Sequence, residues 1–211
     1  AEGCDAPQPV CEWKSRIVGI KTPNMIATGT VLDNGFIVTN RHVAEDHPRL
    51  LTRDETGSIA AAFPLPHPVQ VDLVLLRPDG SGGLSSVSAG RQAEHPQQLY
   101  VVAFDQGRNG ARVYQPGSWA IYPADGASTR ARIHTDARAL PGNSGGAVVD
   151  RSGNFIGILA SGDGRISEVS PAAHIESGAA ATSREHVDDF TRTGTAIRQC
   201  ADALYDAAQV V

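Results

Sequence analysis

The sequence predicts an all-β domain, a sandwich or a barrel, followed by one helix. Short apolar runs recur through residues 16–161 and are separated by turns rich in glycine, proline and aspartate. Helical periodicity is scarce in the same region. Towards the C-terminus, apolar residues instead recur at alternating spacings of three and four, which is typical of one face of an amphipathic helix.

The strand-like runs fall into two sets. Asp33-Asn34-Gly35 predicts a hairpin turn in the first set, because Asn-Gly readily adopts positive φ angles. A Gly/Ser-rich stretch over 79–90 separates this set from the second. The runs are Arg16–Ile20, Ile26–Leu32, Gly35–Thr39 and Val71–Leu76, then Leu99–Phe104, Arg112–Tyr114, Ser118–Tyr122, Gly146–Val149 and Phe155–Ser161.

The C-terminal segment 183–211 predicts a helix, and Ser183 is placed to cap its start. We expect its apolar face to pack on the β domain. That face consists of Val187, Phe190, Gly194, Ile197, Ala201, Leu204, Ala208 and Val211.

Composition narrows the classes of function. A chain of 211 residues with 41% hydrophobic residues can bury a sizeable core. The net charge is −5 and basic residues do not cluster, so we expect no nucleic-acid partner. No apolar run approaches the ~18 residues of a membrane-spanning helix. The oligomeric state stays open.

Three cysteines permit one disulfide and one free thiol. We favour a Cys11–Cys200 bond that ties the extension formed by residues 1–14 to the C-terminal helix. The alternative is Cys4–Cys11 within the extension, with Cys200 as a buried free thiol. A disulfide favours a secreted or periplasmic protein.

The segment Pro141-Gly142-Asn143-Ser144-Gly145-Gly146 is the most informative in the chain. Glycines beside a serine allow a sharp turn that brings the N–H groups of Gly142 and Ser144 near a reacting carbonyl. Two such donors would stabilise an oxyanion. The alternative is an ordinary flexible turn, since these residues are common in turns.

Two further residues give Ser144 a catalytic context. Serine is a weak nucleophile until a base removes its proton, and that base needs a third group to orient it. His42 follows an apolar strand-like run, and Asp72 lies in another, where a buried carboxylate needs a partner. Each has an ordinary explanation alone, as a surface histidine or a strand-edge acid. Together the three favour one catalytic site.

These ordered motifs resemble the trypsin-fold serine peptidases, most closely the compact bacterial HtrA/Deg branch. They are Thr28-Gly29-Thr30-Val31, Thr39-Asn40-Arg41-His42-Val43, Asp72-Leu73-Val74-Leu75-Leu76 and Thr135-Asp136 with Gly142 to Gly146. The resemblance implies a peptidase domain over 15–182 built from two six-stranded antiparallel β-barrels. The first would span about 15–95 and the second about 96–182, with the His-Asp-Ser triad in the cleft between them.

The resemblance also implies a polypeptide substrate and no metal or organic cofactor. Ala160, Ser161 and Gly162 would bind the substrate backbone by β-addition. Ala160 stands where many relatives carry a serine that supports the triad carboxylate. A PDZ domain would follow in an HtrA/Deg peptidase, and we expect a helix there instead.

Arg138 lies six residues before Ser144, where trypsin-like enzymes place the residue at the floor of the primary specificity pocket. A guanidinium in that pocket would favour an acidic side chain. Alternatively, Arg138 turns away to pair with Asp136 or reach solvent, and leaves a small apolar pocket. Both interpretations exclude cleavage after Lys or Arg.

Arg16-Ile17-Val18-Gly19 mimics a zymogen activation site, but Asn143 stands where the freed amine would need an aspartate. We therefore expect Ile17 in the first strand and no proteolytic activation. The predicted function is a serine endopeptidase. The alternatives are a catalytically silent domain of the same fold and an esterase, against which the β-rich pattern and the missing Gly-x-Ser-x-Gly elbow argue.

Overall fold

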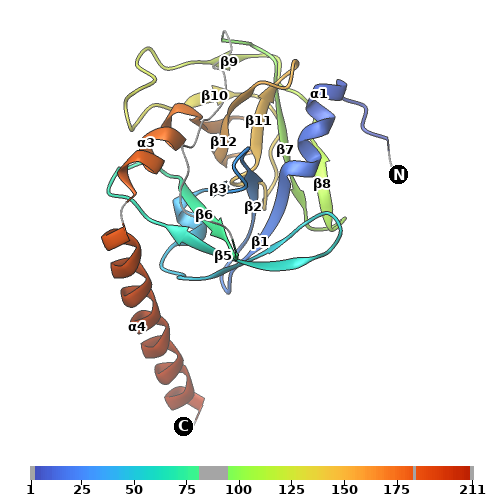
Figure 1. Cartoon of the computed structure of the whole chain (residues 1–211). Coiled ribbons are helices and arrows are strands. Elements are labelled where there is room, and N and C mark those ends of the chain that lie inside the picture. The colour runs from blue at the N-terminus through green and yellow to red at the C-terminus, as the bar shows by residue number, and fades with distance from the viewer. Residues whose placement is uncertain (1–2, 81–94, 183, 210–211) are drawn as a thin grey trace.

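The computed structural model describes residues 3–80, 95–182 and 184–209. Two β units lie side by side, and helix α4 extends away from them (Figure 1). The predicted all-β fold with a C-terminal helix is confirmed. Ser183 and Val211, expected at the two ends of that helix, lie outside the described residues.

The first β unit is a closed antiparallel barrel with the strand order β1-β2-β3-β6-β5-β4. Gly35 has a φ of +84° between β2 and β3, so the hairpin predicted from Asn-Gly is confirmed. The strands are β1 (Ile17–Lys21), β2 (Ile26–Val31), β3 (Ile37–Thr39), β4 (Leu50–Arg53), β5 (Ile59–Leu65) and β6 (Val74–Pro78), with the short helix α2 (Arg41–Ala44) after β3.

The second unit is a seven-stranded sheet in the order β8-β7-β11-β12-β13-β10-β9, instead of the six strands expected. Its two end strands are successive parts of one segment, 110–121, which is interrupted around Pro116. The sheet is therefore rolled, and the same segment contributes to both of its ends. The strands are β7 (Leu99–Asp105), β8 (Gly110–Val113), β9 (Ala120–Ile121), β10 (Ile133–Thr135), β11 (Ala147–Asp150), β12 (Phe155–Gly162) and β13 (Ser167–Pro171).

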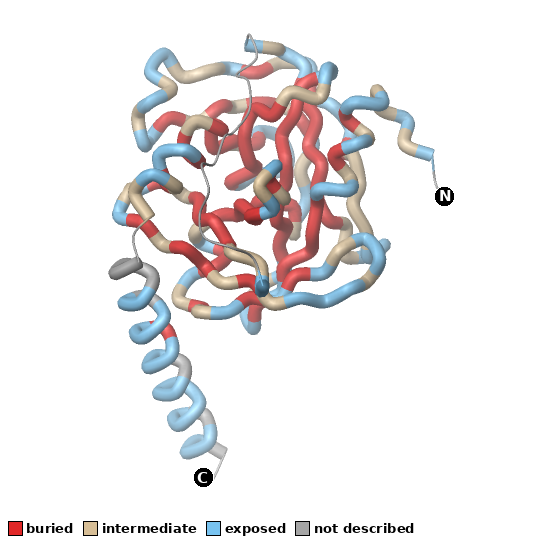
Figure 2. Tube along the Cα trace, viewed as in Figure 1, coloured by how far each residue is buried: buried red, intermediate tan, exposed pale blue. Residues whose placement is uncertain are grey.

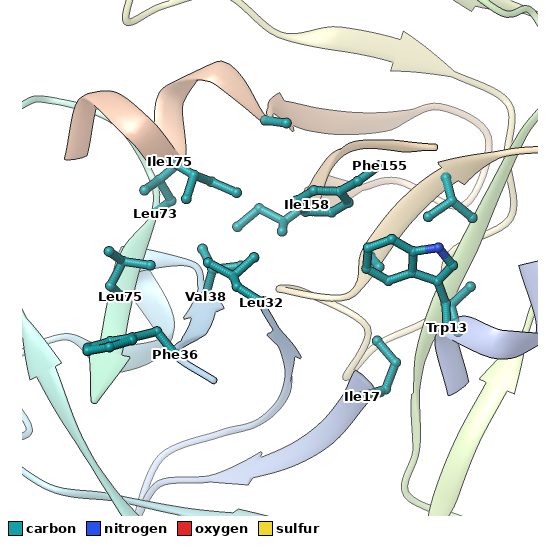
Figure 3. Close-up of a cluster of buried hydrophobic side chains, with 14 of the residues drawn as sticks. Trp13, Ile17, Leu32, Phe36, Val38, Leu73, Leu75, Phe155, Ile158 and Ile175 are labelled. Atoms are coloured by element: carbon teal, nitrogen blue, oxygen red, sulfur yellow. The ribbon is translucent and has the colours of Figure 1, made fainter. Parts of the chain in front are cut away.

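The main core joins both units to the N-terminal extension and to helix α3 (Ala173–Ala181) (Figures 2 and 3). The extension forms two short helices, α1 (Gln8–Cys11) and η1 (Glu12–Arg16). Trp13 stacks on Phe155 with ring centroids 5.2 Å apart, and its indole N–H donates to the Gly153 carbonyl. The extension is thus an integral part of the domain.

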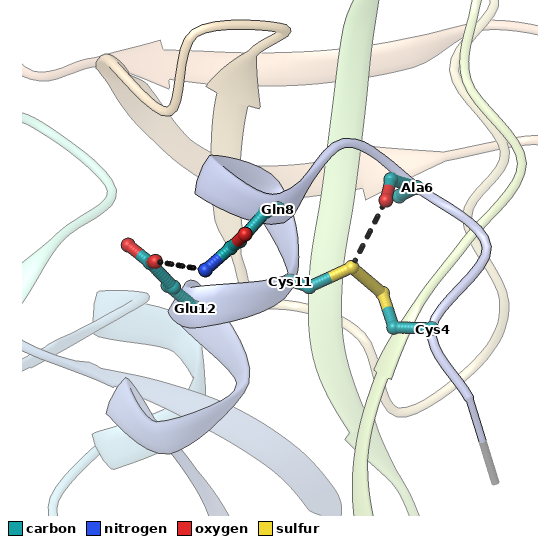
Figure 4. The surroundings of a disulfide bond; sticks show 5 residues. All are labelled: Cys4, Ala6, Gln8, Cys11 and Glu12. Atoms are coloured by element: carbon teal, nitrogen blue, oxygen red, sulfur yellow. Dashed lines mark hydrogen bonds between the residues drawn. A yellow bond between two sulfur atoms is a disulfide. The ribbon is translucent and has the colours of Figure 1, made fainter.

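The structure corrects the favoured disulfide. Cys4 bonds to Cys11 across α1, with a Cα–Cα distance of 6.0 Å (Figure 4). Cys200 is a free, exposed thiol on α4. The expectation of a Cys11–Cys200 bond was wrong because α4 (Arg184–Gln209) leaves the domain on the far side from the extension (Figure 1).

Helix α4 meets the domain at Gly194, which is buried. A Cβ at this position would collide with the backbone carbonyl of Asp46. Beyond it, Ile197 and Leu204 are 43% and 67% exposed. The predicted packing along the whole apolar face is therefore wrong for the C-terminal half of the helix. None of the helices described has the length and apolarity needed to cross a membrane.

Candidate active site

His42 and Asp72 are brought together by pairing between β3 and β6. Thr39 at the end of β3 pairs with Val74 at the start of β6. His42 follows in α2, and Asp72 lies two residues before the start of β6, so both emerge at the same end of the barrel. The Asn40 side chain donates to the Asp72 backbone carbonyl over 3.0 Å, which fixes the loop that carries the carboxylate.

The Asp72 carboxylate receives two hydrogen bonds from His42. The ring Nδ1 lies 2.8 Å from Oδ2, and the backbone N–H lies 3.1 Å from Oδ1. A carboxylate accepts, so Nδ1 carries the proton and Nε2 is left as the basic nitrogen. The hydrogen bond to Asp72 raises the pKa of His42 above its usual 6.5, partial burial opposes this, and the charges of Asp72 and Glu45 add to the increase.

The pKa of Asp72 lies below its usual range. Burial is the largest single influence and pushes this pKa up, but the hydrogen bonds and charge of His42 and the positive charge of Arg132 outweigh it. Arg132 itself is anchored, because its guanidinium donates to the carbonyls of Ala131 and Thr129 over 2.7 and 3.2 Å. The sequence analysis did not identify Arg132, since a lone arginine in a loop gives no signal.

Ser144 lies in the loop before β11, and the first barrel holds this loop. The Thr28 N–H donates to the Ser144 carbonyl, and the Thr28 hydroxyl to the Gly142 carbonyl, each over 2.9 Å. Thr30 donates to the Gly145 carbonyl over 2.9 Å. Two buried threonines on β2 of the first barrel thus position the serine loop of the second. The motif Thr28-Gly29-Thr30 alone did not predict this role.

The backbone donors of the serine loop divide into two groups. The N–H groups of Asn143, Gly145 and Gly146 donate to the carbonyls of Leu140, Leu159 and Asn143. Within the described part of the chain, those of Gly142 and Ser144 have no such acceptor. These two are the donors that the sequence assigned to an oxyanion. The Ser144 hydroxyl donates to the Ala160 carbonyl over 3.4 Å, rather than to His42.

Residues near the expected specificity pocket have distinct environments. Asp136 accepts from the N–H and hydroxyl of Ser118 and from the N–H of Trp119. Arg138 is exposed, and its N–H donates to the Gln115 carbonyl over 3.2 Å. The exposure of Arg138 favours the arrangement in which its guanidinium reaches solvent, and the role of Arg138 towards substrate stays a prediction.

The expected substrate-binding strand is β12. Ala160 is buried, whereas Ser161 and Gly162 are exposed at the end of the strand, where its register with β13 shifts. The Ser161 hydroxyl donates to Glu168 over 3.0 Å. Ile17 is the first residue of β1 and pairs with Thr30, which confirms its predicted place in the first strand.

The model of the trypsin-like peptidase domain matches residues 27–158, more than half of the chain. The chain belongs to the trypsin-like peptidase family. The serine endoprotease DegS of Escherichia coli K12 is 28% identical over 138 residues, which cover 63% of this chain and 39% of DegS. DegS of Salmonella typhimurium 14028s is 26% identical over 137 residues. The predicted likeness to the HtrA/Deg branch is confirmed, and the aligned part spans about two fifths of these relatives.

Solved structures share the fold of this chain. An inactive form of the Rv3671c protease, whose source is M. tuberculosis, superposes with a TM-score of 0.65 at 18% sequence identity. The match covers 86% of this chain and 99% of that chain. The two rolled β units described above are therefore the two barrels of a trypsin-like fold.

One cluster of potential metal ligands occurs in the described part of the chain. Ligand atoms of Glu45, Asp46 and His47 lie within 4.8 Å of one another, on the loop after α2. These three residues are consecutive in the chain, and none of them belongs to the predicted triad. Glu45 is relevant for another reason, because its charge acts on His42.

We predict that Glu45→Gln shifts the acidic limb of the pH–kcat/KM profile to lower pH. The Glu45 charge stabilises the imidazolium of His42 and so raises its pKa. In the predicted triad His42 acts as the base, so we expect activity to require its neutral imidazole and to be lost as pH falls through this raised pKa. An exposed charge pair contributes about 0.2–1 kcal/mol, which corresponds to a shift of about 0.1–0.7 pH units. Glu55→Gln, a change far from His42, is the control, and an equal shift in both variants would contradict the prediction.

Proposed function

We propose that the protein is a serine endopeptidase that hydrolyses peptide bonds through an acyl-enzyme. The observation that carries this proposal is the paired His42 and Asp72, with Nδ1 and Oδ2 2.8 Å apart. This pair leaves His42 Nε2 as a base of raised pKa. Ser144 supplies the hydroxyl on a loop that the first barrel holds, and Gly142 and Ser144 supply two backbone donors.

In the first half of the reaction, the Ser144 hydroxyl turns from the Ala160 carbonyl towards His42. Its oxygen attacks the substrate carbonyl carbon while His42 Nε2 takes the proton. The carbonyl oxygen becomes negatively charged and accepts hydrogen bonds from the N–H groups of Gly142 and Ser144. His42 then gives its proton to the departing amine, the peptide C–N bond breaks, and an ester on Ser144 remains.

In the second half, a water molecule replaces the amine. His42 takes a proton from this water as its oxygen attacks the ester, and returns the proton to Ser144 as the C–O bond breaks. The products are a free carboxylate and the regenerated hydroxyl. Asp72 remains ionised throughout, in keeping with its lowered pKa, and it stabilises the imidazolium in both halves.

A catalytically silent binding domain of the same fold is the alternative. The hydrogen-bonded pair, the unoccupied backbone donors and the held serine loop all support catalysis, since a binding surface has no need of them. An organofluorophosphonate probe separates the two functions. We predict one adduct per chain at Ser144, identified by peptide mass spectrometry, and a loss of labelling at acidic pH as His42 becomes protonated. An intact protein that stays unlabelled at pH 8 would contradict the proposal.

The residues around the proposed specificity pocket favour an apolar side chain before the scissile bond. Ala137, Ala139 and Ala160 are small and uncharged, and Arg138 is exposed. The three alanines offer no charged group that could pair with a basic or an acidic side chain of the substrate.

We predict that matched peptides with Val or Ala before the scissile bond have kcat/KM values at least tenfold above those with Arg or Glu. The Arg138→Ala variant should keep this order, since we place its guanidinium outside the pocket. A Glu preference that disappears in Arg138→Ala would show instead that the guanidinium enters the pocket when substrate binds. A preference for Arg would exclude both arrangements.

We also propose that the protein works in an oxidising compartment, as a secreted or periplasmic protein. The Cys4–Cys11 disulfide supports this location, because such bonds form and persist mainly outside the reducing cytosol.

A further inference from the structure

The C-terminal end of β12 has a free edge beside the serine loop. Strand β11 pairs with β12 only as far as Ile158. Residues 160–162 follow, with β13 on one edge and, within the described part of the chain, no strand on the other. An extended peptide can add to such an edge through backbone hydrogen bonds.

The Ala160 carbonyl sets the register of such a peptide. This carbonyl accepts from the Ser144 hydroxyl over 3.4 Å, so it faces the free edge and lies beside the nucleophile. A substrate residue whose N–H binds there is the residue before the scissile bond, because its own carbonyl comes within reach of Ser144. The two strands beside β12 pair with it antiparallel. In the same arrangement, the preceding substrate residue lies opposite Ser161.

A bulge at Ala160 turns Ser161 to the outer face of the sheet. Leu159 pairs with Val169 of β13, and both belong to the buried core of the second unit. The next pair is Ser161 with Glu168, so Ala160 is an extra residue without a partner on β13. An extra residue reverses the alternation of side chains. Ser161 is therefore exposed, and the substrate side chain opposite it shares this outer face.

Glu168 places a carboxylate on this outer face. Its Oε2 accepts from the Ser161 hydroxyl over 3.0 Å, and its Oε1 lies 3.5 Å from Nε2 of His134 on β10. His134 and Ser161 are the cross-strand neighbours of Glu168 on its two sides. The carboxylate is thus held in position, yet the Glu168 side chain is 46% exposed and can accept a further hydrogen bond.

The other charges around β12 leave Glu168 dominant opposite Ser161. The turn between β12 and β13 carries one charge of each sign, Asp163 and Arg165. Arg132, just before β10, is the competing cation, but β10 is separated from β12 by β13. Its guanidinium donates to two carbonyls of its own loop, and its charge acts on Asp72.

We propose that Glu168 selects a lysine or an arginine as the second residue before the scissile bond. This inference rests on the proposed peptidase function, since it concerns the substrate of the same site. The substrate strand and β13 lie on opposite edges of β12, about 10 Å apart at two strand spacings. A long basic side chain spans this distance across the small Ser161, and its end forms a charge-assisted hydrogen bond with Glu168.

Peptides that differ only at this position test the proposal. They carry Val before the scissile bond and Lys, Ala or Glu as the residue preceding it. We expect kcat/KM of the Lys peptide to exceed that of the Ala peptide about two- to fivefold, as for an exposed ion pair. Glu168→Gln keeps an acceptor for Ser161 and should bring this ratio to one, and Glu168→Lys should favour the Glu peptide. Glu55→Gln, exposed between β4 and β5, is the control and should keep the Lys preference.

A binding measurement separates this inference from the proposed function, because it needs no hydrolysis. Fluorescence anisotropy compares the labelled peptides on Ser144→Ala and on Ser144→Ala/Glu168→Gln. The Lys peptide should bind severalfold more tightly than the Ala peptide to the first variant and equally to the second. Selectivity in binding without hydrolysis by the unmodified protein would contradict the peptidase function alone.

Three results would overturn the assignment of Glu168. One is equal affinity for the Lys and Ala peptides, or no binding of any peptide. Another is a Lys preference that Glu168→Gln leaves unchanged. The third is a preference for the Glu peptide in the unmodified protein, which would assign this face to Arg132.

Discussion

Replacing Ser144 with alanine is expected to reduce kcat/KM by about 10⁴ to 10⁶, because removing one member of a triad removes the covalent route itself. The alanine has no oxygen to attack the substrate and gives His42 no proton to accept. The remaining rate would come from substrate binding and from the Gly142 and Ser144 backbone donors. The fold should be unaffected, since the single hydrogen bond lost is the 3.4 Å contact with Ala160.

The measurement uses a fluorogenic peptide and the same organofluorophosphonate probe. Ser177→Ala is the matched control, because Ser177 is exposed on α3 and bonds to its own helix. Since the triad acts as a unit, Ser144→Ala/His42→Ala should be no slower than Ser144→Ala alone. More than one per cent residual activity in Ser144→Ala, with unchanged substrate preference, would place the nucleophile elsewhere.

The parts of the site that could be predicted from the sequence are those whose residue types are chemically constrained. A serine between glycines, a histidine after a strand and an acid in an apolar run each have few alternative uses in combination. Ile17 could be placed in β1 on the same grounds, since Asn143 has no negative charge to form an ion pair with a freed amine. The structure adds the contact that joins His42 to Asp72.

Elements with weak local patterns were missed. The runs β10 and β13 are short, and β13 carries one apolar residue, Val169, between two serines. The alanine-rich β5 contains Pro64 and lacks alternation. These strands form because neighbouring strands supply the other half of their hydrogen bonds, and a propensity argument does not include that tertiary contribution.

Long-range geometry explains the errors at the two termini. The disulfide partner of Cys11 depends on where α4 leaves the domain, which spacing along the chain does not define. The apolar face of α4 has the expected periodicity, yet it meets the domain at Gly194 and is exposed at Leu204. The role of Thr28 could not be predicted for the same reason, because the Gly142 carbonyl that accepts from its hydroxyl lies 114 residues away in the chain.

Gly145→Ala is expected to have the second-largest effect, on both stability and activity. Gly145 has a φ of +89°, which costs a residue with a side chain about 1–2 kcal/mol. An added Cβ would also lie 2.5 Å from the Thr39 hydroxyl and in collision with the Thr28 carbonyl. Overpacking of this kind costs a further ~1–3 kcal/mol, so we expect a total loss of about 2–5 kcal/mol in the free energy of unfolding.

The same substitution should lower kcat/KM at least about 100-fold, because Gly145 follows the nucleophile and a displacement of the order of 1 Å has that effect. Gly35→Ala is the matched control. Its φ of +84° imposes a similar backbone strain, but a Cβ there meets nothing within 4 Å. Gly35→Ala should lose only the ~1–2 kcal/mol that the positive φ costs a residue with a side chain, and it should keep full activity. Urea unfolding and peptide kinetics on both variants measure the difference, and equal losses would show that contact between the barrels at Thr28 does not position the serine loop.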